Sequence, residues 1–155
     1  MPGGTPGGQA ASTDAAVALD TGAVDRLVLP VPRSVREAIA AGATSAVRVD
    51  ASTELDSQVV AVALAEHLGD RDLVVCGDYS LDRGTGSVPA FLAGELSMAQ
   101  ALGLLEVGVD RDDAGALRVV RRLDGGRREI LDVTPPAVLS VEGSAASLRR
   151  ASLAM

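Results

Sequence analysis

The sequence predicts an α/β fold, a Rossmann-like parallel sheet with helices on both faces, followed by an antiparallel β-hairpin extension. Between residues 27 and 77, short apolar runs alternate with stretches of helical period, in the order strand, helix, strand, helix, strand. Short connections and right-handed crossovers arrange such an alternation as a parallel layer covered by helices. Beyond residue 102 the extended runs follow one another directly, and Asp124-Gly125-Gly126 between two of them predicts a hairpin.

Composition divides the chain into one folded domain and two weakly patterned ends. With 155 residues, 47% of them apolar, the chain is long enough for one domain with a hydrophobic core. Residues 1–22 are rich in Gly, Ala, Ser and Thr and lack a sustained apolar period, so we expect a flexible N-terminal segment. The α/β domain is expected over residues 23–143, and residues 144–155 form a separate C-terminal segment.

The first half of the domain carries the signals of the alternating layer. Strands are expected at residues 27–31, 45–50 and 72–77, and helices at residues 34–42 and 54–70. Ser34 and Gly42 are typical cap residues at the two ends of the first helix. The last of these strands is an uninterrupted apolar run, which is typical of a parallel strand covered on both faces.

The second half opens with one more helix and then becomes strand-rich. The helix is expected over residues 87–102, with Pro89 in its first turn, where a missing N–H is tolerated. Extended runs follow at residues 104–111, 116–133 and 136–143, and we expect them to pair as antiparallel strands.

Charge and composition exclude several classes of partner. The 14 Arg residues against 21 Asp and Glu give a net charge of −7 and an isoelectric point near 4.6, without the basic surface that nucleic acids or anionic membranes require. No apolar run approaches the roughly 20 residues of a membrane span, and the N-terminus has no signal-peptide pattern. Cys76 is the single cysteine, which fits a reducing compartment. We expect a cytoplasmic protein that neither binds nucleic acid nor inserts into a membrane.

The sequence offers no residue set for bond chemistry or for a metal. One histidine and one cysteine cannot supply a typical metal-ligand cluster, and no Ser-His-Asp or Cys-His arrangement supports a hydrolase. The hairpin carries a cluster of arginines: Arg121, Arg122, Arg127 and Arg128. They could pair with an acidic partner surface, although we favour an exposed, solvated hairpin.

A glycine-rich loop joins the strand that ends at Gly77 to the helix that begins near Ser87. Ligands of open α/β sheets bind beyond the carboxyl ends of the strands, so the loop lies where a ligand site is expected. Gly84 and Gly86 allow close approach of the backbone, Thr85 and Ser87 supply hydroxyls, and a helix N-terminus favours phosphate. The alternative is an ordinary strand-to-helix loop, because Gly-Thr-Gly matches neither the Walker pattern nor the dinucleotide fingerprint.

One segment resembles the signature of the electron transfer flavoprotein β subunit. It reads VVRRLDGGRREILDVTPPAVLS, residues 119–140, and its matching positions are Arg121, Asp124, Gly125, Gly126, Glu129, Leu131, Pro136, Val138 and Leu139. Ser140 departs from the pattern, which has Thr, Ala or Cys there. LVVCGDYSLDRGTGSVPAFLA is similar to the nucleotide loop of the same family, and VREAIAAGATSAVRVD resembles its upstream helix and strand. The resemblance covers residues 27–155.

The resemblance implies an electron carrier and not an enzyme. It implies the β-type subunit of a heterodimer that takes electrons from dehydrogenases and passes them towards a quinone reductase, with FAD held mostly by the α subunit and AMP bound by the β subunit. Position by position, the AMP contacts fall on Ser80, Leu81, Asp82, Arg83, Gly84, Thr85, Gly86, Ser87 and Val88. RASLAM aligns with the partner-recognition segment of the family, which makes residues 144–155 that segment and Leu153 its docking residue.

The chain also departs from the family pattern. The loop is shorter than usual and has Gly84 where Gln is common, a form that resembles the β-like subunits associated with mycofactocin systems. The family's first strand and its C-terminal arm have no counterpart, so we expect a chain truncated at both ends. The alternative function is a stand-alone adenine-nucleotide-binding module without a redox role, because fold alone does not separate the two.

Overall fold

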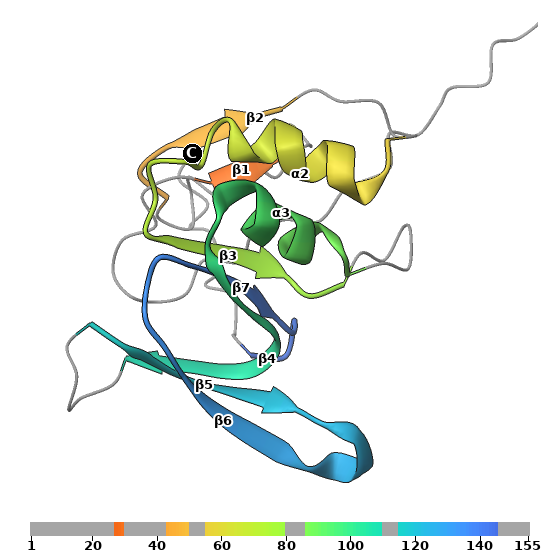
Figure 1. The fold of residues 1–155 in the computed structure, drawn as a ribbon, viewed down its shortest axis with the longest axis vertical. Helices are drawn as coiled ribbons and strands as arrows, with labels where there is room; N and C mark the ends of the chain where they lie inside the picture. The colour runs from red at the N-terminus through yellow and green to blue at the C-terminus, as the bar shows by residue number, and fades with distance from the viewer. Residues whose placement is uncertain (1–26, 30–42, 50–54, 80–85, 110–114, 146–155) are drawn as a thin grey trace, which may run out of the picture.

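The structure is a computed structural model, and it describes residues 27–29, 43–49, 55–79, 86–109 and 115–145. Its elements, drawn in Figure 1, are β1 (Leu27–Leu29), β2 (Ala46–Arg48), α2 (Ser57–Ala65), β3 (Leu73–Gly77), α3 (Val88–Leu96), β4 (Ala99–Val109), β5 (Leu117–Arg122), the 3₁₀ turn η1 (Asp124–Gly126), β6 (Arg128–Val133) and β7 (Ala137–Val141). The flexible segment predicted for residues 1–22, the helix predicted over residues 34–42 and the C-terminal recognition segment beyond residue 145 lie outside the described residues.

A mixed five-stranded sheet forms the centre of the fold, in the order β3-β7-β4-β5-β6. β3, β7 and β4 run parallel, whereas β5 and β6 continue the sheet as antiparallel strands. β1 and β2 pair in parallel as a separate two-stranded sheet. The predicted α/β class is confirmed, with a parallel part followed by the hairpin extension.

The position of β7 corrects one prediction. We expected residues 136–143 to join an antiparallel region, but β7 lies between β3 and β4 and runs parallel to both (Figure 1). All five of its residues are buried. A strand covered on both faces reads as a continuous apolar run, the pattern typical of the centre of a parallel sheet. The last strand in the sequence therefore completes the middle of the sheet.

The end of α3 corrects a second prediction. The helix was expected to continue to residue 102, but it ends at Leu96, and β4 begins at Ala99. Ser97 adopts a left-handed conformation, with φ 54° and ψ 38°, and the N–H of Met98 donates back to the carbonyl of Ala93 at 3.0 Å. A left-handed residue with such a backward hydrogen bond is a common way to end a helix.

The two described helices pack on the same face of the sheet. The Asp56 carboxylate caps α2 by accepting a hydrogen bond from the N–H of Val59 at 2.9 Å. Ala61 of α2 and Leu92 of α3 join one apolar cluster with Val74 and Val138 of the sheet, together with Leu68 and Ala93. The helix predicted at residues 34–42 lies outside the described residues.

The opposite face of the sheet holds a second apolar cluster. It contains Ala101, Leu104, Val119, Val133, Ala137, Leu139 and Val141. Val138 and Leu139 are adjacent in β7 and belong to different clusters, because successive side chains of a strand point to opposite faces. Burial on both sides fixes the register of the central strands, and the register determines where their carboxyl ends lie relative to one another.

The predicted hairpin forms at the Asp-Gly-Gly sequence. β5 and β6 pair antiparallel from Leu117 opposite Val133 to Arg122 opposite Arg128. Gly125 and Gly126 have φ values of 72° and 75°, a conformation that glycine adopts without the steric cost of a side chain.

Candidate functional site

The carboxyl ends of the parallel strands meet at a partly buried polar contact. The hydroxyl of Ser140, in β7, donates a hydrogen bond to Oδ1 of Asp78 at 2.8 Å. The same hydroxyl oxygen accepts a hydrogen bond from the N–H of Gly103, in β4, at 2.9 Å. Asp78 directly follows β3, so these three residues, which we call the strand-end junction, connect three neighbouring parallel strands.

The direction of both hydrogen bonds follows from the groups involved. A backbone N–H can only donate, so the Ser140 oxygen accepts from Gly103 and its own proton points to Asp78. Ser140 is 1% exposed, and it is the buried polar side chain of the described core. Both hydrogen-bonding roles of the hydroxyl are used, which is the condition under which a polar group is tolerated in a core.

Gly103 reaches Ser140 through an irregularity in β4. Ala101 is opposite Leu139 and Leu104 is opposite Val141, so β4 holds one residue more than β7 over this stretch. Gly103 has a φ of 70°, within the left-handed region that favours glycine. An extra residue of this kind bends a strand and redirects its groups. The bulge thereby turns the Gly103 N–H towards the Ser140 hydroxyl.

The start of α3 lies directly against the end of β3. A Cβ atom added to Gly86 would lie 2.3 Å from the carbonyl oxygen of Asp78, a separation that no real side chain tolerates. The sequence suggested that Gly86 gives a ligand access to the backbone. The structure adds a different requirement, because the residue at this position must leave space for the main chain of Asp78.

The predicted AMP contacts divide between described and undescribed residues. Ser80, Leu81, Asp82, Arg83, Gly84 and Thr85 lie outside the described residues. Gly86, Ser87 and Val88 come together at the start of α3, which begins where it was predicted and has Pro89 in its first turn. Ser87 precedes the helix without capping it through its side chain. The role of these residues in AMP binding stays a prediction.

Sequence reasoning missed the strand-end junction. Asp78 had one signal, because it is the first polar residue after a buried strand. Ser140 was noticed only as a departure from a family pattern, and Gly103 was placed beyond the end of a helix that is shorter than predicted. Their contacts span 37 and 62 positions of the sequence. No local pattern encodes a pairing over such a separation.

Cys76 lies in β3, opposite Ser140 of the junction, and its thiol is unreactive at neutral pH. Burial raises the pKa of its thiol to about 12. The side chain therefore stays protonated at neutral pH, whereas the thiolate is the reactive form. It is partly buried and packs against the apolar cluster that contains Ala61 of α2 and Leu92 of α3.

The described residues contain neither a metal-binding group of side chains nor a membrane-spanning helix. In the described ranges, His, Cys, Asp and Glu side chains do not form a group of three or more that could hold a metal ion. Among the described helices, none is long and apolar enough to cross a membrane.

Fold and junction define an α/β protein whose parallel strands end beside a strand-to-helix loop, the place where ligands bind in open α/β sheets. No family model matches the sequence. The electron transfer flavoprotein subunit beta of Dictyostelium discoideum is 33% identical to it over 112 residues, which are 70% of this chain and 43% of that relative. The chain belongs to the electron transfer flavoprotein β-subunit family. The chain spans less than half the length of this relative. The relative's name says nothing about the mycofactocin subgroup, so membership of that subgroup stays a prediction.

Proposed function

We propose that the chain acts as the β-type subunit of a heterodimeric electron transfer flavoprotein. In this role it carries electrons from dehydrogenases towards a quinone reductase and is not itself an enzyme. The observation that carries the proposal is the 33% identity to the Dictyostelium discoideum β subunit over 70% of this chain. The acidic composition and the single cysteine fit a cytoplasmic carrier of this kind.

An adenine nucleotide at the start of α3 fits the residues there. The N-terminus of a helix favours phosphate through its N–H groups and its dipole. The Ser87 side chain does not take up those N–H groups as a cap, and Pro89 has none to satisfy. The carboxylate of Asp78 disfavours a phosphate placed against the end of β3, so we assign the phosphate to the helix side. AMP is the nucleotide that we propose, at residues 80–88.

FAD is the second proposed cofactor, shared with the α subunit and held mostly by it. It supplies the redox centre of the complex when bound. Among the residues described here, β6 pairs with one strand, β5, and forms an edge of the sheet. Ile130 in this edge strand is 66% exposed. An open edge with an exposed large apolar residue is the kind of surface that a partner chain covers.

The test is co-expression of the chain with its α subunit, followed by an absorbance spectrum of the purified complex. We expect a yellow heterodimer with one FAD, whose flavin is reduced by a cognate dehydrogenase. A colourless protein that binds AMP would instead identify a stand-alone nucleotide-binding module. A colourless protein that binds no AMP would refute both functions.

Leu153 is the residue that we propose for docking to the dehydrogenase. Burial of one leucine is worth about 1.5–3 kcal/mol, or about one to two decades in affinity. Leu153→Ala should therefore slow flavin reduction at limiting dehydrogenase concentration while flavin content stays unchanged. A variant that keeps the parental rate, or loses flavin as well, rejects the docking role.

A further inference from the structure

Asp78 contacts the segments on either side of the glycine-rich loop, namely the end of the parallel strands and the start of α3. On one side it follows β3, and its N–H donates to the carbonyl of Val141 in β7 at 3.1 Å. On the other side its carbonyl oxygen faces Gly86 so closely that no side chain fits between them. Its carboxylate is held by Ser140. The backbone of Asp78 therefore contacts both the central strand and the start of α3.

The hydroxyl of Ser140 fixes the orientation of Asp78. Without it, the Gly103 N–H and Oδ1 of Asp78 would both lose the partner they have in the structure. The Ser140 side chain is 1% exposed and both hydrogen bonds are partly buried, so water replaces the lost contacts only in part. Burial of a polar side chain in a strand that is otherwise apolar has a free-energy cost. Alanine would fill the position without this cost, so packing alone does not explain the serine.

We propose that Asp78 and Ser140 are positioning residues for nucleotide binding. They hold the end of β3 and the start of α3 in the relative placement that presents the first turn of α3 to the phosphate. This inference rests on the proposed function, and it adds two residues outside the loop to which the family resemblance assigns the contacts. Neither residue needs to touch the nucleotide for this role.

The first arm of the test is calorimetry of AMP binding to the complex with the α subunit. Ser140→Ala should raise the Kd for AMP about tenfold or more, the scale expected for an unpaired buried group. Ser140→Thr retains the hydroxyl and should stay within about threefold of the parent. Val119→Ala is the matched control, because Val119 is fully buried in β5, which does not pair with β3 or β7. It should lower the melting temperature and leave the Kd unchanged.

The second arm is amide hydrogen exchange in the same complexes without nucleotide. Ser140→Ala should increase exchange at the amides of Tyr79, Gly86, Ser87 and Val88, and Val119→Ala should not. If the parent complex fails to bind AMP, the proposed nucleotide site is wrong, while exchange still decides whether the junction holds the loop ends. If Ser140→Ala does not assemble, Asp78→Ala replaces it in the exchange measurement, where the same increase at the start of α3 is expected.

Each of the following results would overturn the proposal. An unchanged Kd in Ser140→Ala would show that nucleotide binding does not depend on the junction. Unchanged exchange at the start of α3 would show that the junction does not hold that segment. An equal loss of affinity in Val119→Ala, or no recovery in Ser140→Thr, would assign the effect to general destabilisation.

Discussion

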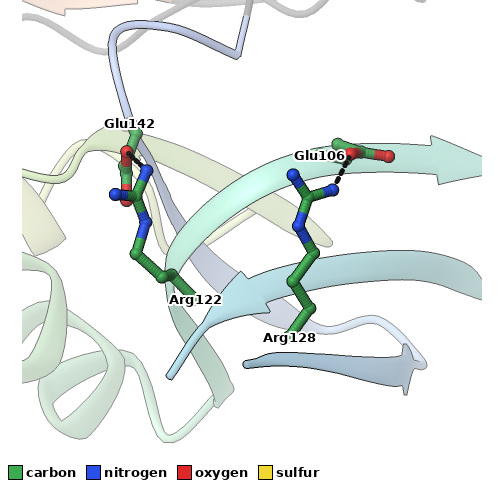
Figure 2. Close-up of polar contacts among 4 residues, drawn as sticks. All are labelled: Glu106, Arg122, Arg128 and Glu142. Atoms are coloured by element: carbon green, nitrogen blue, oxygen red, sulfur yellow. Dashed lines mark hydrogen bonds and ion pairs between the residues drawn. The ribbon is translucent and has the colours of Figure 1, made fainter. Parts of the chain in front are cut away.

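Arg122 and Arg128 are directly opposite each other in the β5–β6 ladder, and each forms an ion pair with a glutamate from another part of the chain. Arg122 contacts Glu142 at 3.2 Å and Arg128 contacts Glu106 at 3.1 Å. Figure 2 shows both arginines extending from the hairpin on the same side towards these carboxylates. Like charges placed opposite each other destabilise a ladder. The two glutamates therefore offset a repulsion that the hairpin sequence creates.

Removal of either glutamate should lower stability by a small, salt-dependent amount. Both pairs are exposed, so we expect Glu106→Gln or Glu142→Gln to reduce the free energy of unfolding by about 0.5–1 kcal/mol. Asp132→Asn is the matched control, because Asp132 is opposite Arg118 and its removal leaves no pair of facing arginines. Urea unfolding at 50 mM and at 1 M NaCl should show a larger loss for the glutamate variants at low salt, since salt screens exposed charges. Equal losses at both salt concentrations would contradict this account.

The left-handed Ser97 provides a stabilising substitution. A left-handed conformation costs about 1–2 kcal/mol for a residue with a side chain, whereas glycine costs about 0.5–1 kcal/mol in lost chain entropy. Ser97→Gly should therefore raise the free energy of unfolding by about 0.5 kcal/mol, and Ser97→Ala should not raise it. The urea midpoints of the two variants measure the difference. A lower midpoint for Ser97→Gly than for Ser97→Ala would contradict the observed helix end.

The sequence predicted those parts of the fold that depend on neighbouring residues. The alternation of apolar runs predicted β2, α2 and β3, and the Asp-Gly-Gly turn predicted the hairpin, because local propensity and local geometry decide these elements. The end of α3 was missed because Ser97 carries no sequence signal of a left-handed residue, unlike glycine. The order of strands was missed because β7 finds its place by burial between two strands that are far from it in the sequence.

The candidate site also has one part that could be predicted from the sequence and one part that could not. The start of α3 near Ser87 could be predicted, because Pro89 and the preceding glycines mark a helix beginning. The contacts of Ser140 with Asp78 and Gly103 could not, because they depend on the parallel placement of β7 and on a bulge in β4. The local sequence pattern therefore predicts where the loop lies in the chain. Only tertiary packing brings together the strand-end junction beside it.

Cys76 should be inert in the folded chain and reactive in the unfolded one. Burial raises the pKa of its thiol from the ordinary value of 9.0 to about 12. At pH 8, labelling by a thiol reagent should be slow in buffer and fast in concentrated urea. Because the folded state keeps its proton between pH 9 and pH 12 while the unfolded state loses it, stability should fall as the pH rises through this window. Fast labelling of the native protein at pH 8 would contradict the burial of the thiol.

Gly86 and Gly94 form a matched pair with opposite expected effects. A Cβ atom at Gly86 would collide with the Asp78 carbonyl oxygen at 2.3 Å, whereas nothing lies within 4 Å of one at Gly94, in α3. Gly86→Ala should lower the free energy of unfolding by about 1–3 kcal/mol, as overpacking does. Gly94→Ala should raise it by about 0.5–1 kcal/mol, the gain of alanine over glycine inside a helix.

Nucleotide binding should separate the same two variants. The added methyl group of Gly86→Ala displaces the start of α3 from the end of β3, so the Kd for AMP should rise, and Gly86→Val should raise it further. Gly94 is exposed and lies near the end of the helix, so Gly94→Ala should leave the Kd unchanged. Thermal unfolding and calorimetry on the same samples measure both effects. If Gly86→Ala matches the parent in stability and in AMP affinity, the close approach of Asp78 to Gly86 does not shape this site.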